Sequence, residues 1–223
     1  MIVSCYFTSI EDPQRKVMMP KNSQSYIGRW YESLNDEAVV FHDELTEEFA
    51  SWFPGVKFVK VSQPTVDILK YRWLVYFDYF CHHSNHKEIF FTDISDCICV
   101  QKTQAKPGIL YCGDENRSMS RWITQASVAP LLTLPKYKYL FTKEGDLLNA
   151  GIVGGTYSII YDFLWLMAWA INKMRFADKQ ILGDMALFNY IAYIYFDNII
   201  HGYPVNSNYG SYESRNDIWF IHK

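Results

Sequence analysis

The chain has 223 residues, of which 17% are aromatic, and its formal net charge is only −3 at pH 7. This length is enough for one large domain with a substantial apolar core, so we expect residues 1–223 to form a single domain, which could be part of a longer multidomain protein. The chain has no block of lysines and arginines, which argues against a nucleic-acid partner.

The first half of the chain alternates strands with a helix. Three short apolar strands are predicted at 1–7, 38–45 and 56–61, with a polar loop from Thr8 to Ser25. A helix is predicted at 65–83, with Thr65 as its cap and Asp67 in its first turn, and an apolar strand follows within 87–100. Continuously apolar strands separated by a helix predict an α/β fold with a mostly parallel central sheet flanked by helices.

The second half is predicted as loop, strands and two long helices. Residues 101–122 are polar and without regular pattern, which predicts a loop, whereas 136–141 and 147–156 are strand-like. Helices are expected at about 155–175 and at 183–196. The second opens with Gly183 and Asp184, where the helix dipole favours a carboxylate. A last strand, DIWFIHK, ends the chain.

The stretch KEIFFTDISDCICV places two aspartates, Asp93 and Asp96, at the end of a strand that should be buried. Ligands bind outside the carboxyl ends of strands in parallel sheets, and carboxylates suit Mg²⁺ or Mn²⁺ held together with a diphosphate. An Asx turn at Asp93 with a solvated Asp96 explains the spacing equally well. The two carboxylates reach one metal ion only if the chain turns after Asp93, because strand positions three apart face opposite sides.

The succession of TDISD, LLNAGIVGGT, GDMALFN and a terminal IHK resembles the nucleotide-sugar glycosyltransferases of the GT-A (Rossmann-like) fold. Within them, MIVSCYFT, DPQR and RWYESL resemble the N-terminal glycosyltransferase domain of large chlorovirus proteins. The family's usual acidic motif is Asp-x-Asp, and this chain has one residue more between its aspartates.

The resemblance implies a set of site residues. Asp93, Asp96 and His222 would hold the metal, and Asn149 and Asp184 would be catalytic. Donor contacts are implied for Thr8, Arg72, Asp93, Gly151 and Lys223. An arginine on a helix surface and a helix-start carboxylate are the plain alternatives for Arg72 and Asp184. Tyr6, Trp122 or Tyr209 could stack on a uracil or sugar ring.

The resemblance implies a metal-dependent glycosyltransferase that transfers a hexosyl or deoxyhexosyl group from a UDP-sugar to a glycan or monosaccharide acceptor. It further implies Mn²⁺ (or Mg²⁺) as cofactor, retention at the anomeric carbon, and other glycosyltransferase domains of the same chain as partners. Two alternatives stay open: a nucleotidyltransferase acting on a sugar phosphate, and an inactive sugar-binding module. The position after the first strand, TSIEDPQR, lacks the glycine typical of the nucleotidyltransferase loop.

The cysteines, the apolar runs and the N-terminus indicate in which cellular compartment the protein is expected. The five cysteines are irregularly spaced, which is typical of reduced thiols. The most apolar run, 159–171, contains Asp162 and is shorter than the roughly 20 residues that a bilayer requires. The N-terminus does not have the pattern of a signal peptide. We therefore expect a cytoplasmic protein without a membrane span, in the host cytoplasm if it is viral.

Overall fold

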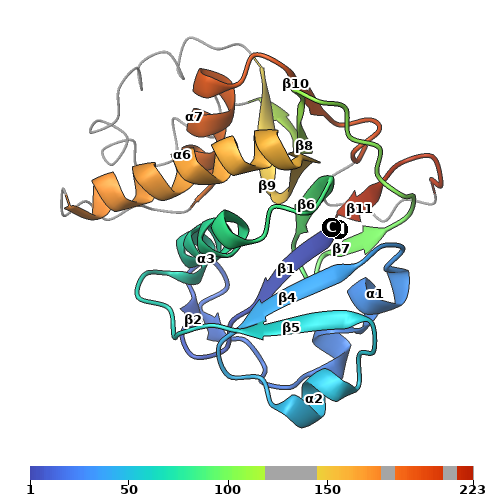
Figure 1. Cartoon of the computed structure of the whole chain (residues 1–223), viewed down its shortest axis with the longest axis vertical. Coiled ribbons are helices and arrows are strands. Elements are labelled where there is room, and N and C mark those ends of the chain that lie inside the picture. The colour runs from blue at the N-terminus through green and yellow to red at the C-terminus, as the bar shows by residue number, and fades with distance from the viewer. Residues whose placement is uncertain (119–144, 177–183, 208–214, 223) are drawn as a thin grey trace.

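The structure, a computed structural model, describes residues 1–118, 145–176, 184–207 and 215–222. Its centre is a seven-stranded sheet in the order β10-β8-β9-β6-β1-β4-β5 (Figure 1). The strands of this sheet are β1 Ile2–Tyr6, β4 Ala38–His42, β5 Val56–Lys60, β6 Glu88–Thr92, β8 Leu110–Ser118, β9 Asp146–Thr156 and β10 Ile199–His201. Strand β9 is antiparallel to both of its neighbours, and the other adjacent pairs are parallel. The predicted mostly parallel sheet is confirmed.

Helices cover both faces of this sheet (Figure 1). They are α1 Gln24–Ser33, α2 Glu47–Ser51, α3 Ile68–His82, α6 Tyr157–Phe176 and α7 Met185–Tyr195. Helices α3, α6 and α7 pack in one apolar cluster, and α1 and α2 pack in the other. The α/β class with flanking helices is therefore confirmed. No helix within the described ranges is both long and apolar enough to cross a membrane.

Successive residues of the central strands point alternately into the two clusters. In β1, Ile2 faces the α1 and α2 side while Val3 faces the α3 side, and Phe90 and Phe91 divide in the same way in β6. This alternation is the consequence of the two-residue period of a strand. It explains why these strands consist mostly of apolar residues, since both of their faces are covered.

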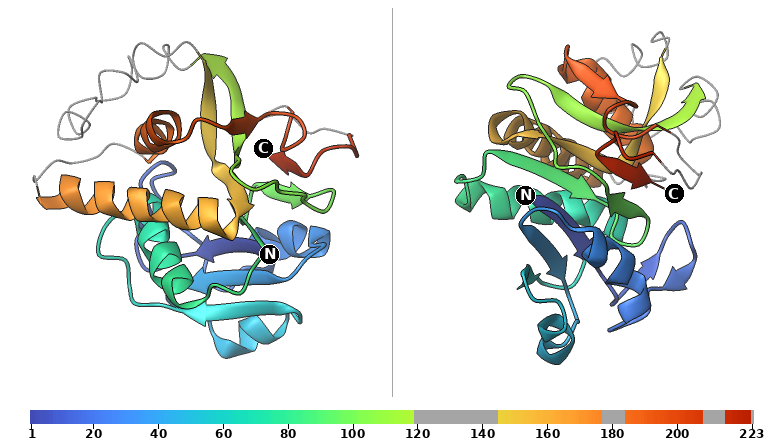
Figure 2. Two further views of the ribbon diagram at one scale, coloured as in Figure 1. Left: turned by 45° about the horizontal axis from the view of Figure 1, so that its top comes forward. Right: turned by 90° about the vertical axis from the view of Figure 1, so that its right-hand side faces the viewer.

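Two small sheets lie beside the large one. Strands β7 Cys97–Cys99 and β11 Phe220–His222 pair antiparallel, so the end of the chain returns next to the residues that follow β6 (Figure 2). Strands β2 Glu11–Asp12 and β3 Val17–Met18 form a short hairpin. The predicted last strand is confirmed for residues 220–222.

Several predicted elements were wrong. The segment from Thr8 to Ser25 was expected to be loop, but it contains the β2–β3 hairpin and the first residues of α1. Residues 101–122 were also expected to be loop, yet 110–118 form β8. Helix α3 is capped by Asp67, whose side chain accepts a hydrogen bond from the Lys70 backbone, and not by Thr65. The strand expected at 136–141 lies outside the described residues.

Asn189 fastens α7 to the sheet. Its amide is fully buried and bonds the backbone of β9: its Oδ1 accepts from the Leu148 N–H at 2.9 Å, and its Nδ2 donates to the Leu148 carbonyl at 3.0 Å. Because a buried polar group without a partner costs free energy, this amide helps to fix the position of α7 against β9.

We predict that Asn189→Leu lowers the free energy of unfolding by about 2–3 kcal/mol, because it leaves backbone groups of Leu148 buried and unbonded. Urea unfolding followed by circular dichroism measures this. Asn198→Leu, at an exposed position, is the control and should have little effect. Equal stability of the wild type and the Asn189 variant would contradict the prediction.

Candidate functional site

A polar cavity of about 280 Å³ lies where β1 and β6 end at their carboxyl termini. All the described candidate residues except Thr8 and Tyr6 line it. Its charged lining consists of five carboxylates, Asp12, Asp93, Asp96, Glu115 and Asp184, and two guanidinium groups, Arg15 and Arg72. Such a surplus of carboxylates in a confined space favours a bound cation, because like charges in a cleft repel each other.

The acidic stretch after β6 forms a turn. The Asp93 carbonyl accepts hydrogen bonds from the backbone N–H of Asp96 at 3.4 Å and of Cys97 at 3.0 Å. Strand β7 begins directly afterwards. The turn brings both aspartates to the cavity. A turn after Asp93 is what two aspartates three positions apart need if they are to reach the same metal ion.

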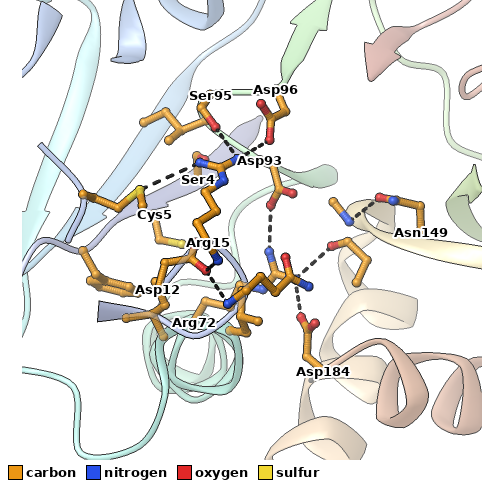
Figure 3. A pocket seen from close by; sticks show the side chains of 18 of the residues that line it. Ser4, Cys5, Asp12, Arg15, Arg72, Asp93, Ser95, Asp96, Asn149 and Asp184 are labelled. Atoms are coloured by element: carbon orange, nitrogen blue, oxygen red, sulfur yellow. Dashed lines mark hydrogen bonds and ion pairs between the residues drawn. The ribbon is translucent and has the colours of Figure 1, made fainter. Parts of the chain in front are cut away.

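Arg72 of α3 lies between two carboxylates (Figure 3). Its Nη1 donates to Asp93 Oδ1 at 2.8 Å, and its Nη2 donates to Asp184 Oδ2 and, at 3.3 Å, to the Ala150 carbonyl. The Arg72 side chain is 9% exposed and that of Asp184 is 2% exposed. Arg72 is thus a buried junction between α3, the end of β6, β9 and the start of α7, and it is not a helix-surface arginine.

The charges of this junction shift one another's pKa values. Burial disfavours the charged form of Arg72, but Asp184 and Asp93 outweigh it and raise the pKa of the guanidinium. Burial likewise opposes ionisation of Asp93, yet Arg72 and then His222 hold the pKa of this carboxyl well below its usual value. Burial raises the pKa of Asp184 in spite of Arg72. Of the two carboxyls bonded to Arg72, Asp93 is therefore the one that stays ionised more firmly.

His222 approaches Asp93 across Gly151. The His222 Nε2 lies 3.7 Å from Asp93 Oδ2, and the Asp93 N–H donates to the Gly151 carbonyl at 2.9 Å. A Cβ at residue 151 would lie 2.4 Å from His222 Cε1 and 2.6 Å from Asp93 Oδ2. Only glycine leaves room for these two side chains, so Gly151 is required by their close approach.

Asn149 is bonded on both sides of its amide. Its Nδ2 donates to Glu115 Oε1 at 2.6 Å, and its Oδ1 accepts from the Gly151 N–H at 2.6 Å. Burial raises the pKa of Glu115, although Asn149 opposes this shift. Glu115 was not predicted because the segment that contains it was expected to be loop. The available signal was an apolar Leu110–Cys112 run followed by acidic residues, the same pattern that marks the end of β6.

Asp96 is paired differently from Asp93. Its Oδ2 accepts from Arg15 Nη2 at 2.6 Å, and Arg15 Nη2 also donates to Ser95 Oγ at 3.3 Å (Figure 3). Sequence reasoning did not single out Arg15, although it lies in the DPQR stretch that carries part of the resemblance.

The remaining candidates lie elsewhere. Thr8 is buried at the end of β1, where its N–H and that of Ser9 donate to the carboxylate of Asp43 at the end of β4. Tyr6 is also buried, so its ring cannot stack on a ligand, whereas Tyr26, whose ring centroid is 4.7 Å from that of Tyr6, lines the cavity. Lys223, Trp122 and Tyr209 lie outside the described residues.

A second group of metal-binding type lies apart from the cavity lining. Ligand atoms of Asp114, Asp146 and His201, from β8, β9 and β10, all lie within 4.8 Å of one another. His201 Nδ1 is 2.9 Å from Asp114 Oδ2, and this hydrogen bond, against the effect of burial, raises the pKa of His201. A divalent cation could bind either here or at the cavity, so metal binding alone does not identify its site.

No family model and no curated protein matches the chain. Among solved structures, the chain is similar to a crystal structure of the galactosyltransferase LgtC in complex with donor and acceptor sugar analogs. The identity is 8% and the TM-score is 0.49, and the match covers 90% of this chain and 72% of that one. With values this low, the likeness does not establish a shared activity.

We predict that Arg72→Met lowers the free energy of unfolding by about 3–5 kcal/mol, because it leaves the buried Asp184 without its cation. The loss of stability should grow as the pH rises from 5 to 8. Without Arg72, the buried carboxyl of Asp184 binds a proton more readily in the folded than in the unfolded state, so the free energy of unfolding decreases as the pH rises.

The double variant Arg72→Met/Asp184→Leu is the control, since it removes both charges and should regain most of the lost stability. Urea unfolding without added metal at the two pH values measures all three proteins. A double variant as unstable as the single one would contradict a role for the ion pair.

Proposed function

We propose that this chain is a metal-dependent glycosyltransferase of the GT-A type that transfers a sugar from a UDP-sugar to a glycan or monosaccharide acceptor. The observation that carries the proposal is that Asp93, Gly151, Asp184 and His222, from four separate motifs of the resemblance, line one cavity. Transfer of a hexosyl or deoxyhexosyl group, and the likeness to chlorovirus domains, rest on the resemblance alone.

The residues of the cavity fit a divalent cation. Asp93 Oδ2 and His222 Nε2 face each other at 3.7 Å, and a carboxylate with an imidazole suits Mn²⁺ better than Mg²⁺. Asp96 would become a further ligand of the cation once Arg15, its present partner, releases it. A cation bound here would neutralise the charge that develops on the departing diphosphate.

The chain's own residues would act mainly by positioning. Arg72 holds Asp93 Oδ1, so that Asp93 Oδ2 is directed toward His222. Asp184 is bonded to Arg72 and almost completely buried, which fits a residue that stabilises the site better than a nucleophile. Asn149 and Gly151 of β9 line the cavity beside Asp93 and His222, so a donor sugar held there would lie next to them. Lys223 stays a predicted diphosphate contact.

Two stereochemical outcomes are compatible with these residues. The Asn-Ala-Gly strand resembles retaining enzymes, so we propose retention of the anomeric configuration. Glu115 favours the alternative, because a carboxyl with a raised pKa in the cavity can take a proton from an acceptor hydroxyl, as inversion requires. Proton NMR of the freshly formed product distinguishes the two.

We predict that the protein with Mn²⁺ releases UDP from at least one UDP-sugar, and that Asp93→Asn weakens UDP binding in the presence of Mn²⁺ by about tenfold or more, because charged contacts of this kind contribute that much. A coupled assay for free UDP and titration calorimetry measure the two effects.

Asp114→Asn is the matched control: it changes an aspartate of the second metal-binding group and should leave UDP binding unaltered. If Asp114→Asn abolishes Mn²⁺-dependent UDP binding and Asp93→Asn does not, the cavity is not the donor site. UDP-sugar binding without any UDP release would favour the sugar-binding module, and pyrophosphate release from a nucleoside triphosphate with a sugar phosphate would favour the nucleotidyltransferase.

A further inference from the structure

Arg15 is held over the cavity by a short, well-bonded turn. It lies between β2 and β3, where Asp12 Oδ1 accepts hydrogen bonds from the N–H of Gln14 at 2.7 Å and of Arg15 at 2.9 Å. The Lys16 N–H donates to the Asp12 carbonyl at 2.8 Å. The backbone at Arg15 is therefore fixed, and the long side chain above it can swing while its base stays in place.

The contact that Arg15 makes is of the kind that exchanges easily. The Arg15 and Asp96 side chains are 41% and 21% exposed, whereas the values for Arg72 and Asp184 are 9% and 2%. Ion pairs open to water contribute little to stability, but breaking a buried pair leaves an uncompensated charge. Of the two arginines that line the cavity, Arg15 is the one that can change partner at small cost.

Few cationic side chains of the cavity are available to bind an anionic ligand. Arg72 is already bonded to two carboxylates, and five carboxylates face two guanidinium groups. A diphosphate entering with its own negative charge needs cations that are not committed elsewhere. Among the described lining residues, only the guanidinium of Arg15 can be freed for this without breaking a buried ion pair.

We propose that Arg15 forms an ion pair with Asp96 in the metal-free cavity and binds the donor diphosphate instead when a metal ion binds Asp96. This inference rests on the proposed function. A cation at Asp96 Oδ2 and the Arg15 guanidinium cannot both occupy the position that Arg15 Nη2 now holds at 2.6 Å. Metal binding therefore releases the guanidinium of Arg15 at the mouth of the cavity. A diphosphate there offers paired oxygens, which a guanidinium binds best because it can donate two parallel hydrogen bonds.

The exchange makes Arg15 act in opposite directions on two ligands. Without nucleotide it competes with the metal ion, so Arg15→Ala should bind Mn²⁺ about two- to fivefold more tightly. With saturating Mn²⁺ it contacts the diphosphate, so the same variant should bind UDP about tenfold or more weakly. Arg15→Lys, which keeps the charge but not the fork, should regain part of the UDP affinity.

Titration calorimetry with Mn²⁺ alone, and with UDP at saturating Mn²⁺, tests this on the wild type and the variants. Arg215→Ala is the matched control, because Arg215 is also paired with an aspartate and similarly exposed, at 44%, but does not line the cavity. The group formed by Asp114, Asp146 and His201 is unchanged in every variant, so its contribution cancels.

Opposite shifts for Mn²⁺ and UDP in Arg15→Ala, with none in Arg215→Ala, support the exchange. If the wild type binds UDP and Arg15→Ala binds it equally well, the proposed role of Arg15 is overturned while the proposed function stands. Weaker binding of Mn²⁺ alone by Arg15→Ala overturns the competition. A wild type that binds no UDP with Mn²⁺ overturns both proposals.

Discussion

The buried guanidinium of Arg72 is the interaction on which the rest of the site depends. It joins α3 to Asp93 after β6, to the Ala150 carbonyl in β9 and to Asp184 at the start of α7. These segments are far apart in the sequence, and α7 is otherwise held at this end by apolar contacts, by Asn189 and by a hydrogen bond from the Ala150 N–H to Met185 Sδ. Because a guanidinium is planar and donates in fixed directions, it also determines how the two carboxylates face the cavity.

The division of the Asp93 oxygens follows from this junction. Oδ1 is bound to Arg72, while Oδ2 faces His222 in the room that the absence of a side chain at Gly151 provides. A carboxylate whose pKa is held low by a neighbouring cation stays ionised, which is the state that a metal ligand needs. Asp96, which is paired with a partly exposed arginine, is held far less firmly. The two aspartates of one motif therefore differ in how readily each can be released.

The fold class and part of the site could be predicted because they depend on local patterns. Strands β1, β4 and β6 are mostly apolar, which indicates a sheet covered on both faces, and TDISD begins at the end of such a strand. Asn149, Gly151 and Asp184 were found through the resemblance, since nothing in a single sequence shows that segments from 93 to 222 meet. The structure establishes that Asp184 is bonded to Arg72, that His222 lies over Gly151, and that Asn149 is bonded to Glu115.

The elements that were missed depend on the tertiary structure. Half of β8 is polar because the strand runs from the core past the cavity, which Glu115 lines, to the exposed surface, and its burial falls along its length from Leu110 to Ser118. Helix α1 buries only Ile27 and Trp30, so its apolar stripe is weak in the sequence, and Trp30 is fixed by donating to Thr92 Oγ1 at 2.9 Å. Arg15 is unremarkable in sequence because its partner Asp96 is distant along the chain.

The most direct test of the account is to locate the metal ion. Crystals grown with Mn²⁺ and UDP allow an anomalous difference map at the manganese edge. The account predicts a peak in contact with Asp93 and His222, beside the diphosphate. A peak only among Asp114, Asp146 and His201, or bound UDP without manganese at Asp93, would contradict it.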